Sequence, residues 1–315
     1  MKQTIFPVLD TALQREMIAI PEGRMNVILD TDTFNEVDDQ FAVTFALLSP
    51  EKMNVHAINA APFLNQKVGT PAEGMEESYQ EILRLLKLLG KDESLAFRGA
   101  ETYLPDRWTP VKSDAVCKII QTARECAAKG EILYILAMGA ITNVASALLM
   151  EPELVKNISV IWLGGHPVYW TPNNEFNWRQ DISAAQVLFS SGVPLIQIPC
   201  LTVASHLLLS RCELEKYCEP CGAIGKFLAQ RVYDELGECG ETRIIWDIAT
   251  VGICLCDANS INAEIVQRPD VNDDGTYSNA DGNPEMLRIR YIARDSIFRA
   301  FFEKLRKFAH NKNTE

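Results

Sequence analysis

The sequence predicts an α/β fold: an open, mostly parallel sheet with helices on both faces. Two observations predict it. Short, continuously apolar segments, typical of strands buried on both faces, alternate along the chain with segments of helical periodicity. The acidic and glycine-containing loops follow the apolar segments directly, and this is where parallel sheets bind ligands. Because no linker, repeat or low-complexity segment divides the 315 residues, we expect a single domain over residues 1–315.

The expected elements can be placed in chain order. They are strands at 26–29, 55–61, 132–137, 158–163 and 195–198, and helices at 39–48, 73–89, 143–150 and 182–190. After about residue 203 we expect helices at 214–236, 246–256 and 295–308, and a polar stretch at 270–284 with a strand on each side. The helix at 73–89 is the most strongly marked, because Ile82, Leu85 and Leu89 repeat at helical spacing and Gly90 can end it.

Composition and charge restrict the class of protein. The formal net charge of −12 argues against a nucleic-acid-binding surface, which needs a basic stripe. No apolar segment approaches the roughly 18 residues that span a bilayer, and the N-terminal residues lack the pattern of a secretory signal. Nine scattered cysteines, an odd number, do not suggest a disulfide framework. We therefore expect a cytoplasmic protein that binds neither nucleic acid nor membrane.

The most informative segment is the acidic loop that follows the first strand. Its five carboxylates lie within ten residues: Asp30, Asp32, Glu36, Asp38 and Asp39. Packing them together at a strand end is unfavourable unless a cation neutralises them, and Ca²⁺ and Mg²⁺ prefer oxygen ligands. A solvated acidic loop is the alternative. Gly139 and Gly164-Gly165 also fall at carboxyl ends of expected strands, so we expect the three loops to form one site.

Four segments resemble, in order and in spacing, the inosine–uridine nucleoside hydrolase family. The acidic loop is similar to the family's Asp-x-Asp…Asp-Asp signature, and residues 135–145 are similar to its Leu-Ala-Thr-Gly-Pro-Leu-Thr-Asn run. Asn174-Glu175-Phe176-Asn177, followed by Asp181 and Ala184-Ala185, resembles its Glu-Phe-Asn…Asp-Pro-Glu-Ala-Ala block. A weaker match is Trp246-Asp247, where the family carries an Asp after His or Trp.

The resemblance implies a Ca²⁺-dependent N-ribohydrolase of nucleoside salvage on a nucleoside hydrolase-like α/β fold. Asp32 and Asp39 would ligate calcium through carboxylates, Met138 through its backbone carbonyl, and Asp247 would complete the site. Asp32 would also be the catalytic base, taking a proton from a calcium-bound water whose pKa the cation lowers. A backbone ligand explains how Met138 can replace the family's usual Thr. The family further implies a homo-oligomer, a dimer or a tetramer.

The same resemblance assigns the ribonucleoside substrate to a second set of side chains. Asp38, Glu175 and Asn177 would hold the ribose hydroxyls, with Asn174 or Asn173, and Asn65, as helpers. Asp30 would orient the loop. Cleavage of an N-glycosidic bond passes through an oxocarbenium-like sugar, which carboxylates around the ring stabilise. Because polar groups that bind a hydroxyl are left unpaired in its absence, ribosides should be preferred to 2′-deoxyribosides.

The acidic loop departs from the family pattern in length. Five residues, 33–37, separate Asp32 from the Asp38-Asp39 pair, where the usual motif has three. The loop must therefore bulge, and it can offer Asn35 or Glu36 to the site.

A second departure is Trp246, which stands where many members carry a His that protonates the leaving base. An indole cannot donate a usable acidic proton, so the leaving base must be activated in another way. The Trp-Asp pair resembles the purine-preferring branch, in which an aromatic ring stacks on the base, and purine nucleosides are therefore the favoured substrates. A core aromatic at a helix start is the alternative. The second ring of a sandwich could come from Trp108, Trp170, Trp178 or Phe63.

Two other functions fit parts of the sequence. Residues 30–34 after a strand are similar to the pattern of haloacid dehalogenase-like, Mg²⁺-dependent phosphatases, with Asp30 as nucleophile, although Phe34 and the Glu-Phe-Asn block do not fit that class. A non-catalytic nucleoside-binding protein is the other alternative, against which the intact acidic set argues. His166 and His206 could each serve the site or be structural, and residues 270–281 resemble a calcium loop but favour a hairpin turn.

Overall fold

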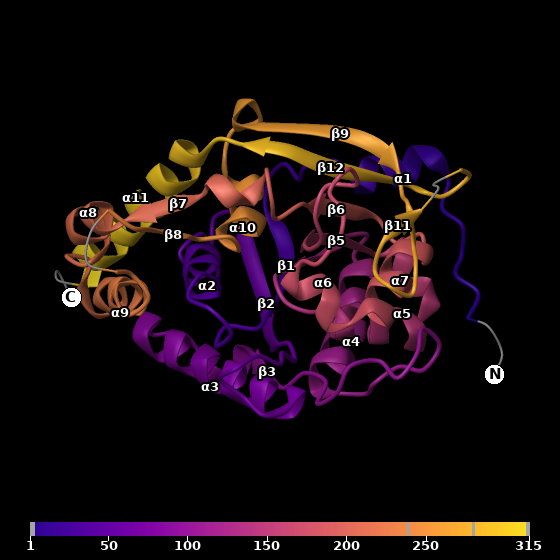
Figure 1. Cartoon of the computed structure of the whole chain (residues 1–315), viewed down its shortest axis with the longest axis horizontal. Coiled ribbons are helices and arrows are strands. Elements are labelled where there is room, and N and C mark those ends of the chain that lie inside the picture. The colour runs from indigo at the N-terminus through magenta and orange to yellow at the C-terminus, as the bar shows by residue number, and fades with distance from the viewer. Residues whose placement is uncertain (1–3, 238–239, 279–280, 313–315) are drawn as a thin grey trace.

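A central sheet of eight strands organises the computed structural model, which describes residues 4–237, 240–278 and 281–312 (Figure 1). The strand order is β3-β2-β1-β4-β5-β6-β12-β9. All neighbours are parallel except β9, which runs antiparallel to β12 at one edge. The strands are β1 (Met25–Thr31), β2 (Met53–Ala60), β3 (Ala96–Phe97), β4 (Leu133–Ala137), β5 (Ile158–Leu163), β6 (Leu195–Ile198), β9 (Ile261–Gln267) and β12 (Glu285–Ile292). The open, mostly parallel sheet is confirmed.

Helices cover both faces of this sheet, as expected (Figure 1). They are α1 (Thr11–Met17), α2 (Asp39–Leu47), α3 (Pro71–Leu89), α4 (Asp114–Ala127), α5 (Thr142–Met150), α6 (Phe176–Gln180), α7 (Ile182–Ser190), α8 (Arg211–Glu213), α9 (Gly222–Tyr233), α10 (Ile248–Leu255) and α11 (Arg294–Lys312). Helices α2, α3 and α9–α11 enclose one apolar core, and α4, α5 and α7 enclose the other. Strand β1 contributes to both, because Val27 and Leu29 face the first core and Ile28 faces the second.

The long helix α3 has the termini that its sequence indicates. The Thr70 hydroxyl accepts a hydrogen bond from the N–H of Glu73 at 3.2 Å, and Pro71 occupies the first turn, where its missing N–H costs nothing. Gly90 ends the helix in the left-handed conformation, with φ of 65°. The helix therefore begins two residues before the expected start and ends where expected.

The expected helix at 214–236 is wrong as a continuous element. Helix α8 begins with a capping box between Ser210 and Glu213, and a π-helical turn follows over Leu214–Cys218. The chain then breaks before α9, because Pro220 lacks an N–H and Gly222 adopts a positive φ of 74°. The apolar periodicity continued across this break, which is why the pattern alone did not reveal it.

The rest of the chain differs from the expected elements only in smaller ways. Helix α10 begins at Ile248, two residues after the expected start, and α1 and α4 were not anticipated. The polar stretch between β9 and β12 contains a short hairpin of β10 (Asp270–Val271) and β11 (Tyr277–Ser278), so the expected turn is confirmed over its described residues. A further pair, β7 (Leu208–Ser210) with β8 (Thr242–Ile244), lies beside α8 and α9 (Figure 1).

Among the described helices, none has the length and apolar character needed to cross a membrane.

Candidate active site

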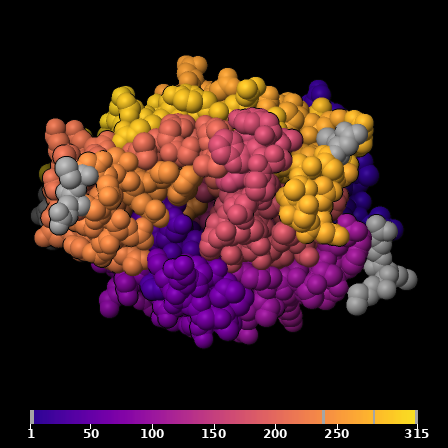
Figure 2. Space-filling view, viewed as in Figure 1, coloured from indigo at the N-terminus to yellow at the C-terminus, as the bar shows by residue number. Residues whose placement is uncertain are grey.

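A cavity of about 280 Å³ opens where the carboxyl ends of β1, β4, β5 and β6 meet the segment that precedes α10. In Figure 2 the surface is hollowed between orange and pink segments, with indigo residues of the N-terminal part exposed in the hollow. Eight of the predicted site residues line the cavity: Asp32, Asp38, Met138, Asn174, Glu175, Asn177, Trp246 and Asp247. The structure therefore brings together motifs that lie more than two hundred residues apart in the sequence.

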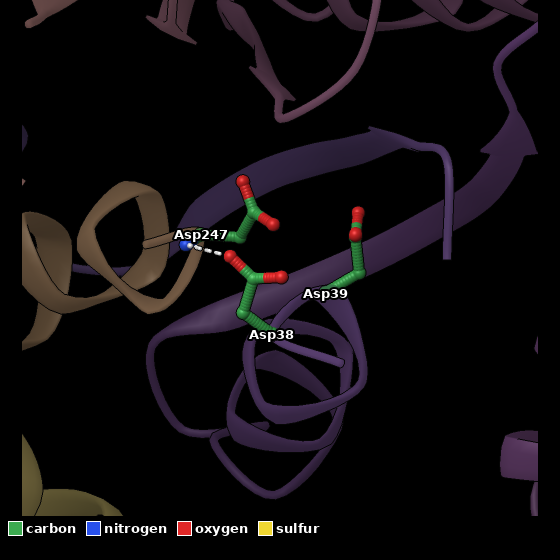
Figure 3. A group of neighbouring side chains, drawn as sticks. All are labelled: Asp38, Asp39 and Asp247. Carbon is green, nitrogen blue, oxygen red and sulfur yellow. Dashed lines mark hydrogen bonds between the residues drawn. The ribbon is translucent and has the colours of Figure 1, made fainter. Parts of the chain in front are cut away.

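Three buried carboxylates form a compact group beside this cavity, and two of them, Asp38 and Asp247, line it. Asp38, Asp39 and Asp247 each place an oxygen within 4.8 Å of the others (Figure 3). Burial, together with the neighbouring aspartates, raises the pKa of Asp39 and Asp247 well above the usual range. Such a group is stable in ionised form only with a compensating cation.

Two of the four predicted metal ligands, Asp39 and Asp247, belong to this group, and Asp38 is its third member. The other two predicted ligands, Asp32 and Met138, line the same cavity. Burial and the charges of Asp39 and Asp38 raise the pKa of Asp32. Within the described chain, Oδ2 of Asp32 and Oδ1 of Asp38 are buried without a hydrogen-bond donor. Buried oxygens of this kind fit a hard divalent cation such as calcium.

Two helix N-termini fix the positions of these carboxylates. Asp38 and Asp39 stand at the start of α2, and Asp247 immediately precedes α10. Oδ2 of Asp38 accepts hydrogen bonds from the N–H groups of Trp246 at 3.0 Å and Asp247 at 3.4 Å, which joins the two helix starts. The Thr31 hydroxyl donates to Oδ1 of Asp39. The positive ends of the helix dipoles also favour negative charge here, although they offset only part of it.

Glu175 and Asn177 form a second part of the cavity wall and are held by the backbone. The Glu175 carboxylate caps α6 by accepting from the N–H groups of Asn177 and Trp178, both at 2.9 Å, and it also accepts from Gly165 at 2.9 Å. The amide of Asn177 donates to the carbonyl of Met138 at 3.2 Å and to that of Leu163 at 3.1 Å. Both donors of Asn177 are thus used, and its carbonyl oxygen is the group left for a ligand.

Two predicted helpers act from behind the cavity instead of lining it. Asn65 does not line it, and its amide donates to Oδ1 of Asn35 at 2.8 Å. Asn173 likewise lies outside the lining, and its Oδ1 accepts from the N–H of His166 at 2.7 Å. Both asparagines therefore orient residues that do line the cavity, a role that sequence position alone could not separate from direct contact.

The longer acidic loop does reach the cavity, because both Asn35 and Glu36 line it. Burial and the nearby Asp38 raise the pKa of Glu36 to about 7, against the lowering effect of its ion pair with Arg243. His166 also lines the cavity, and its buried Nδ1 has no hydrogen-bond partner among the described residues. His206 instead bonds the carbonyl of Ile292 and stacks on Tyr291, so it is structural.

The aromatic candidates occupy different positions relative to the cavity. Trp246 lines the cavity and is half-buried. Trp178 is fully buried and stacks on Trp162, with ring centroids 5.5 Å apart, so it belongs to the core. Trp170 is 41% exposed and lies edge-on to His166 at 6.2 Å, which places it at the rim. Cys200 is a lining residue that sequence analysis missed; its position two residues after β6, at the same sheet edge as the other loops, was the available signal.

The fold and the site together define an α/β protein with a carboxylate-rich pocket at the carboxyl ends of its parallel strands. Residues 27–278 match the family model described as inosine-uridine preferring nucleoside hydrolase. The chain belongs to this family. Membership of this family excludes the phosphatase alternative. The position of Asp30, the nucleophile in that alternative, also argues against it, because Asp30 is fully buried, accepts a hydrogen bond from Asn143 at 3.1 Å and does not line the cavity.

Curated relatives match over part of their length. The chain is 32% identical over 195 residues to the pyrimidine-specific ribonucleoside hydrolase RihA of Escherichia coli O9:H4 (strain HS), which covers 54% of this chain and 58% of the relative. RihA of Escherichia coli O139:H28 gives the same identity and coverage. The chain therefore spans somewhat more than half the length of these relatives.

Solved structures match over almost their whole length. A plant nucleoside hydrolase, PpNRh1, superimposes with a TM-score of 0.70 and 21% identity, covering 89% of this chain and 98% of that one. The purine-preferring ribonucleoside hydrolase from Gardnerella vaginalis gives a TM-score of 0.69 and 22% identity, covering 90% and 99%. At this level of identity the likeness establishes the fold.

Proposed function

We propose that this protein is a calcium-dependent N-ribohydrolase that cleaves ribonucleosides to free base and ribose. The observation that carries the proposal is the pairing of two walls in one cavity. One wall holds buried carboxylates with unpaired oxygens, Asp32 and Asp38 among them, and the other holds Glu175 and Asn177. The first suits a divalent cation and the second suits the hydroxyls of a sugar.

Calcium would be held by Asp39, Asp247, the Met138 carbonyl and either or both of Asp32 and Asp38. A bound calcium ion supplies positive charge that offsets these carboxylates and makes a nearby water more acidic. Asp32 lines the cavity beside the group and is our candidate for the base. The carbonyl of Met138 can serve a cation while it accepts from Asn177, because a carbonyl oxygen has two lone pairs.

The chemical step follows from the positions of these groups. Asp32 takes a proton from the attacking water, whose oxygen bonds to C1′ of the ribose. The bond between C1′ and the base nitrogen breaks, and the base leaves with the bonding electrons and takes up a proton from solvent to become the free base. Asp38 and Glu175 stabilise the positive charge that develops on the sugar. Asn174 and Asn177 orient its hydroxyls, while Asn65 and Asn173 position Asn35 and His166, which line the cavity.

Purine nucleosides are the proposed preference, and Trp246 is the residue that supports it. A half-buried indole on the cavity wall can stack on a purine ring and raise the proton affinity of the departing base. The related proteins differ in base preference by name, since RihA is called pyrimidine-specific and the Gardnerella vaginalis enzyme purine-preferring. The base preference therefore has to be measured.

Two further expectations concern the whole protein. The eight cysteines among the described residues are all free, which is typical of a reducing compartment and supports a cytoplasmic location. A homo-oligomer is our expectation from the family.

The function is tested with a panel of purine and pyrimidine ribonucleosides, assayed for free ribose with added calcium and with a chelator. We expect ribose release that the chelator abolishes and that calcium restores. Binding of a nucleoside without ribose release at any calcium concentration would show instead a non-catalytic nucleoside-binding protein.

A further inference from the structure

The longer acidic loop presents two polar side chains to the cavity that Trp246 also lines. Asn35 and Glu36 both line the cavity, as Trp246 does. The hydrogen bond from the N–H of Trp246 to Asp38, at 3.0 Å, ties this loop to the segment that carries the indole. Glu36 also pairs with Arg243, three residues before Trp246. Because Trp246 is our candidate for stacking on the base, we place the base beside Asn35 and Glu36.

The loop is held from behind by cationic and amide side chains. Lys67 donates to the carbonyl of Asn35 at 2.7 Å, and Arg231 donates to the carbonyl of Glu36 at 3.3 Å. Arg243 pairs with the carboxylate of Glu36 and also contacts Glu235 at 3.1 Å. This surrounding network fixes the backbone of the loop, so Asn35 and Glu36 are oriented before any ligand binds.

The hydrogen bonds within this network leave one donor and one acceptor unused. Oδ1 of Asn35 accepts a hydrogen bond from Asn65, which orients the Asn35 amide and leaves its NH₂ group as an unused donor. Oε2 of Glu36 is taken by Arg243, which leaves Oε1 as an acceptor. Over the part of the chain that the structure describes, neither leftover group has a hydrogen-bond partner. Asn35 is 7% exposed and lines the cavity, so a ligand bound there can accept a hydrogen bond from its NH₂ group.

We propose that Asn35 and Glu36 form the base-selecting edge of this protein, a donor beside an acceptor that favours nucleobases with a carbonyl next to a ring N–H. Hypoxanthine, guanine and uracil have this edge. Adenine and cytosine present an amino group next to an unprotonated ring nitrogen, which is the reverse order. The selection is therefore between oxo and amino bases and is independent of ring size. It rests on the proposed nucleoside hydrolase function.

The test uses two matched substrate pairs, inosine with adenosine and uridine with cytidine, each of which keeps the ring and changes the edge. In the wild-type protein with calcium, kcat/KM should favour the oxo member of both pairs by about tenfold or more, because the amino edge sets donor against donor and acceptor against acceptor. Glu36→Gln should reduce both ratios at least about fivefold. Glu77→Gln, an exposed glutamate on α3, removes the same charge and should leave both ratios unchanged.

A double variant makes the test independent of partial misfolding. Asn35→Asp combined with Glu36→Gln exchanges the donor and the acceptor at unchanged net charge, and it should shift both ratios toward adenosine and cytidine. A loss of fold cannot produce such a reversal. Ratios within twofold of wild type in both the single and the double variant would overturn the proposal.

Binding separates this inference from the proposed function. Calorimetric titration with free hypoxanthine and free adenine measures selection without turnover, with calcium present. Selective binding of hypoxanthine that is lost in Glu36→Gln, in a protein that releases no ribose, would support the base-selecting edge and refute the hydrolase. Ribose release with equal binding and turnover of oxo and amino bases would support the hydrolase and refute the edge.

Discussion

The main-chain N–H of Trp246 donates to Oδ2 of Asp38 at 3.0 Å, across 208 residues of sequence. This bond joins the start of α10 to the start of α2. The N–H of Asp247 donates to the same oxygen at 3.4 Å (Figure 3), and the two bonds together fix Asp247 relative to Asp39. The carboxylate group is therefore built by the fold itself. Replacing one of its members should change cation binding and catalysis more than it changes folding.

The first prediction concerns Asp32, the proposed base. Asp32→Ala should lower kcat for ribose release by about 10²- to 10⁴-fold, the usual contribution of a general base. The same change removes a buried carboxylate next to Asp38 and Asp39, so the midpoint of thermal unfolding without calcium should stay the same or rise. Asp234→Ala, at an exposed position, is the control. Near-native turnover in Asp32→Ala would rule out the assigned role.

The second prediction links calcium to pH. The pKa values of Asp39 and Asp247 are raised in the folded protein by burial and by the charge of Asp38, above the value of about 3.9 for an unfolded chain. The folded state then binds protons more tightly than the unfolded state, so without calcium this contribution to stability is lost as pH rises through the folded pKa values. Calcium should compensate for that loss.

The measurement is the shift in thermal midpoint on adding calcium at pH 8 and at pH 5.5. We expect a larger shift at pH 8, because protons compete with the cation for the same carboxylates at pH 5.5. Asp247→Asn should reduce the shift at pH 8. Equal shifts at both pH values, or none, would contradict a cation site at this group.

Much of this site was predictable because each motif directly follows a strand or begins a helix. The expected strand at 158–163 and helix at 182–190 were found with the same bounds, and the carboxyl ends of parallel strands gathered the loops. Roles that depend on side-chain direction were not predictable. Asn65 and Asn173 lie next to the site in sequence and behind it in space, and only the fold shows that each bonds a lining residue.

The third prediction concerns Trp246. If the indole stacks on the base, Trp246→Ala should lower kcat/KM for purine nucleosides by about 5- to 150-fold, equivalent to a stacking contribution of about 1–3 kcal/mol. Trp246→Phe should recover most of that loss, because a phenyl ring also stacks. If Trp246 is only a core aromatic, the alanine variant will instead unfold at lower temperature while its kcat/KM at 25 °C changes little.

The fourth prediction concerns the 2′-hydroxyl of the sugar. The acceptors on the ribose wall are rigid: Glu175 is fixed by three backbone N–H groups, and Asn177 has both amide hydrogens bonded to carbonyls. They cannot turn to find other partners when a hydroxyl is missing, so the loss of that hydroxyl should leave buried acceptors unpaired. Inosine should therefore have a kcat/KM at least about 10²-fold above that of 2′-deoxyinosine.

Asn177→Ala should lower kcat/KM for inosine and reduce the ratio between the two nucleosides, because the variant has one acceptor fewer to leave unpaired. Equal turnover of inosine and 2′-deoxyinosine by the wild-type protein would mean that Glu175 and Asn177 do not recognise the 2′-hydroxyl, and it would contradict the role assigned to Asn177.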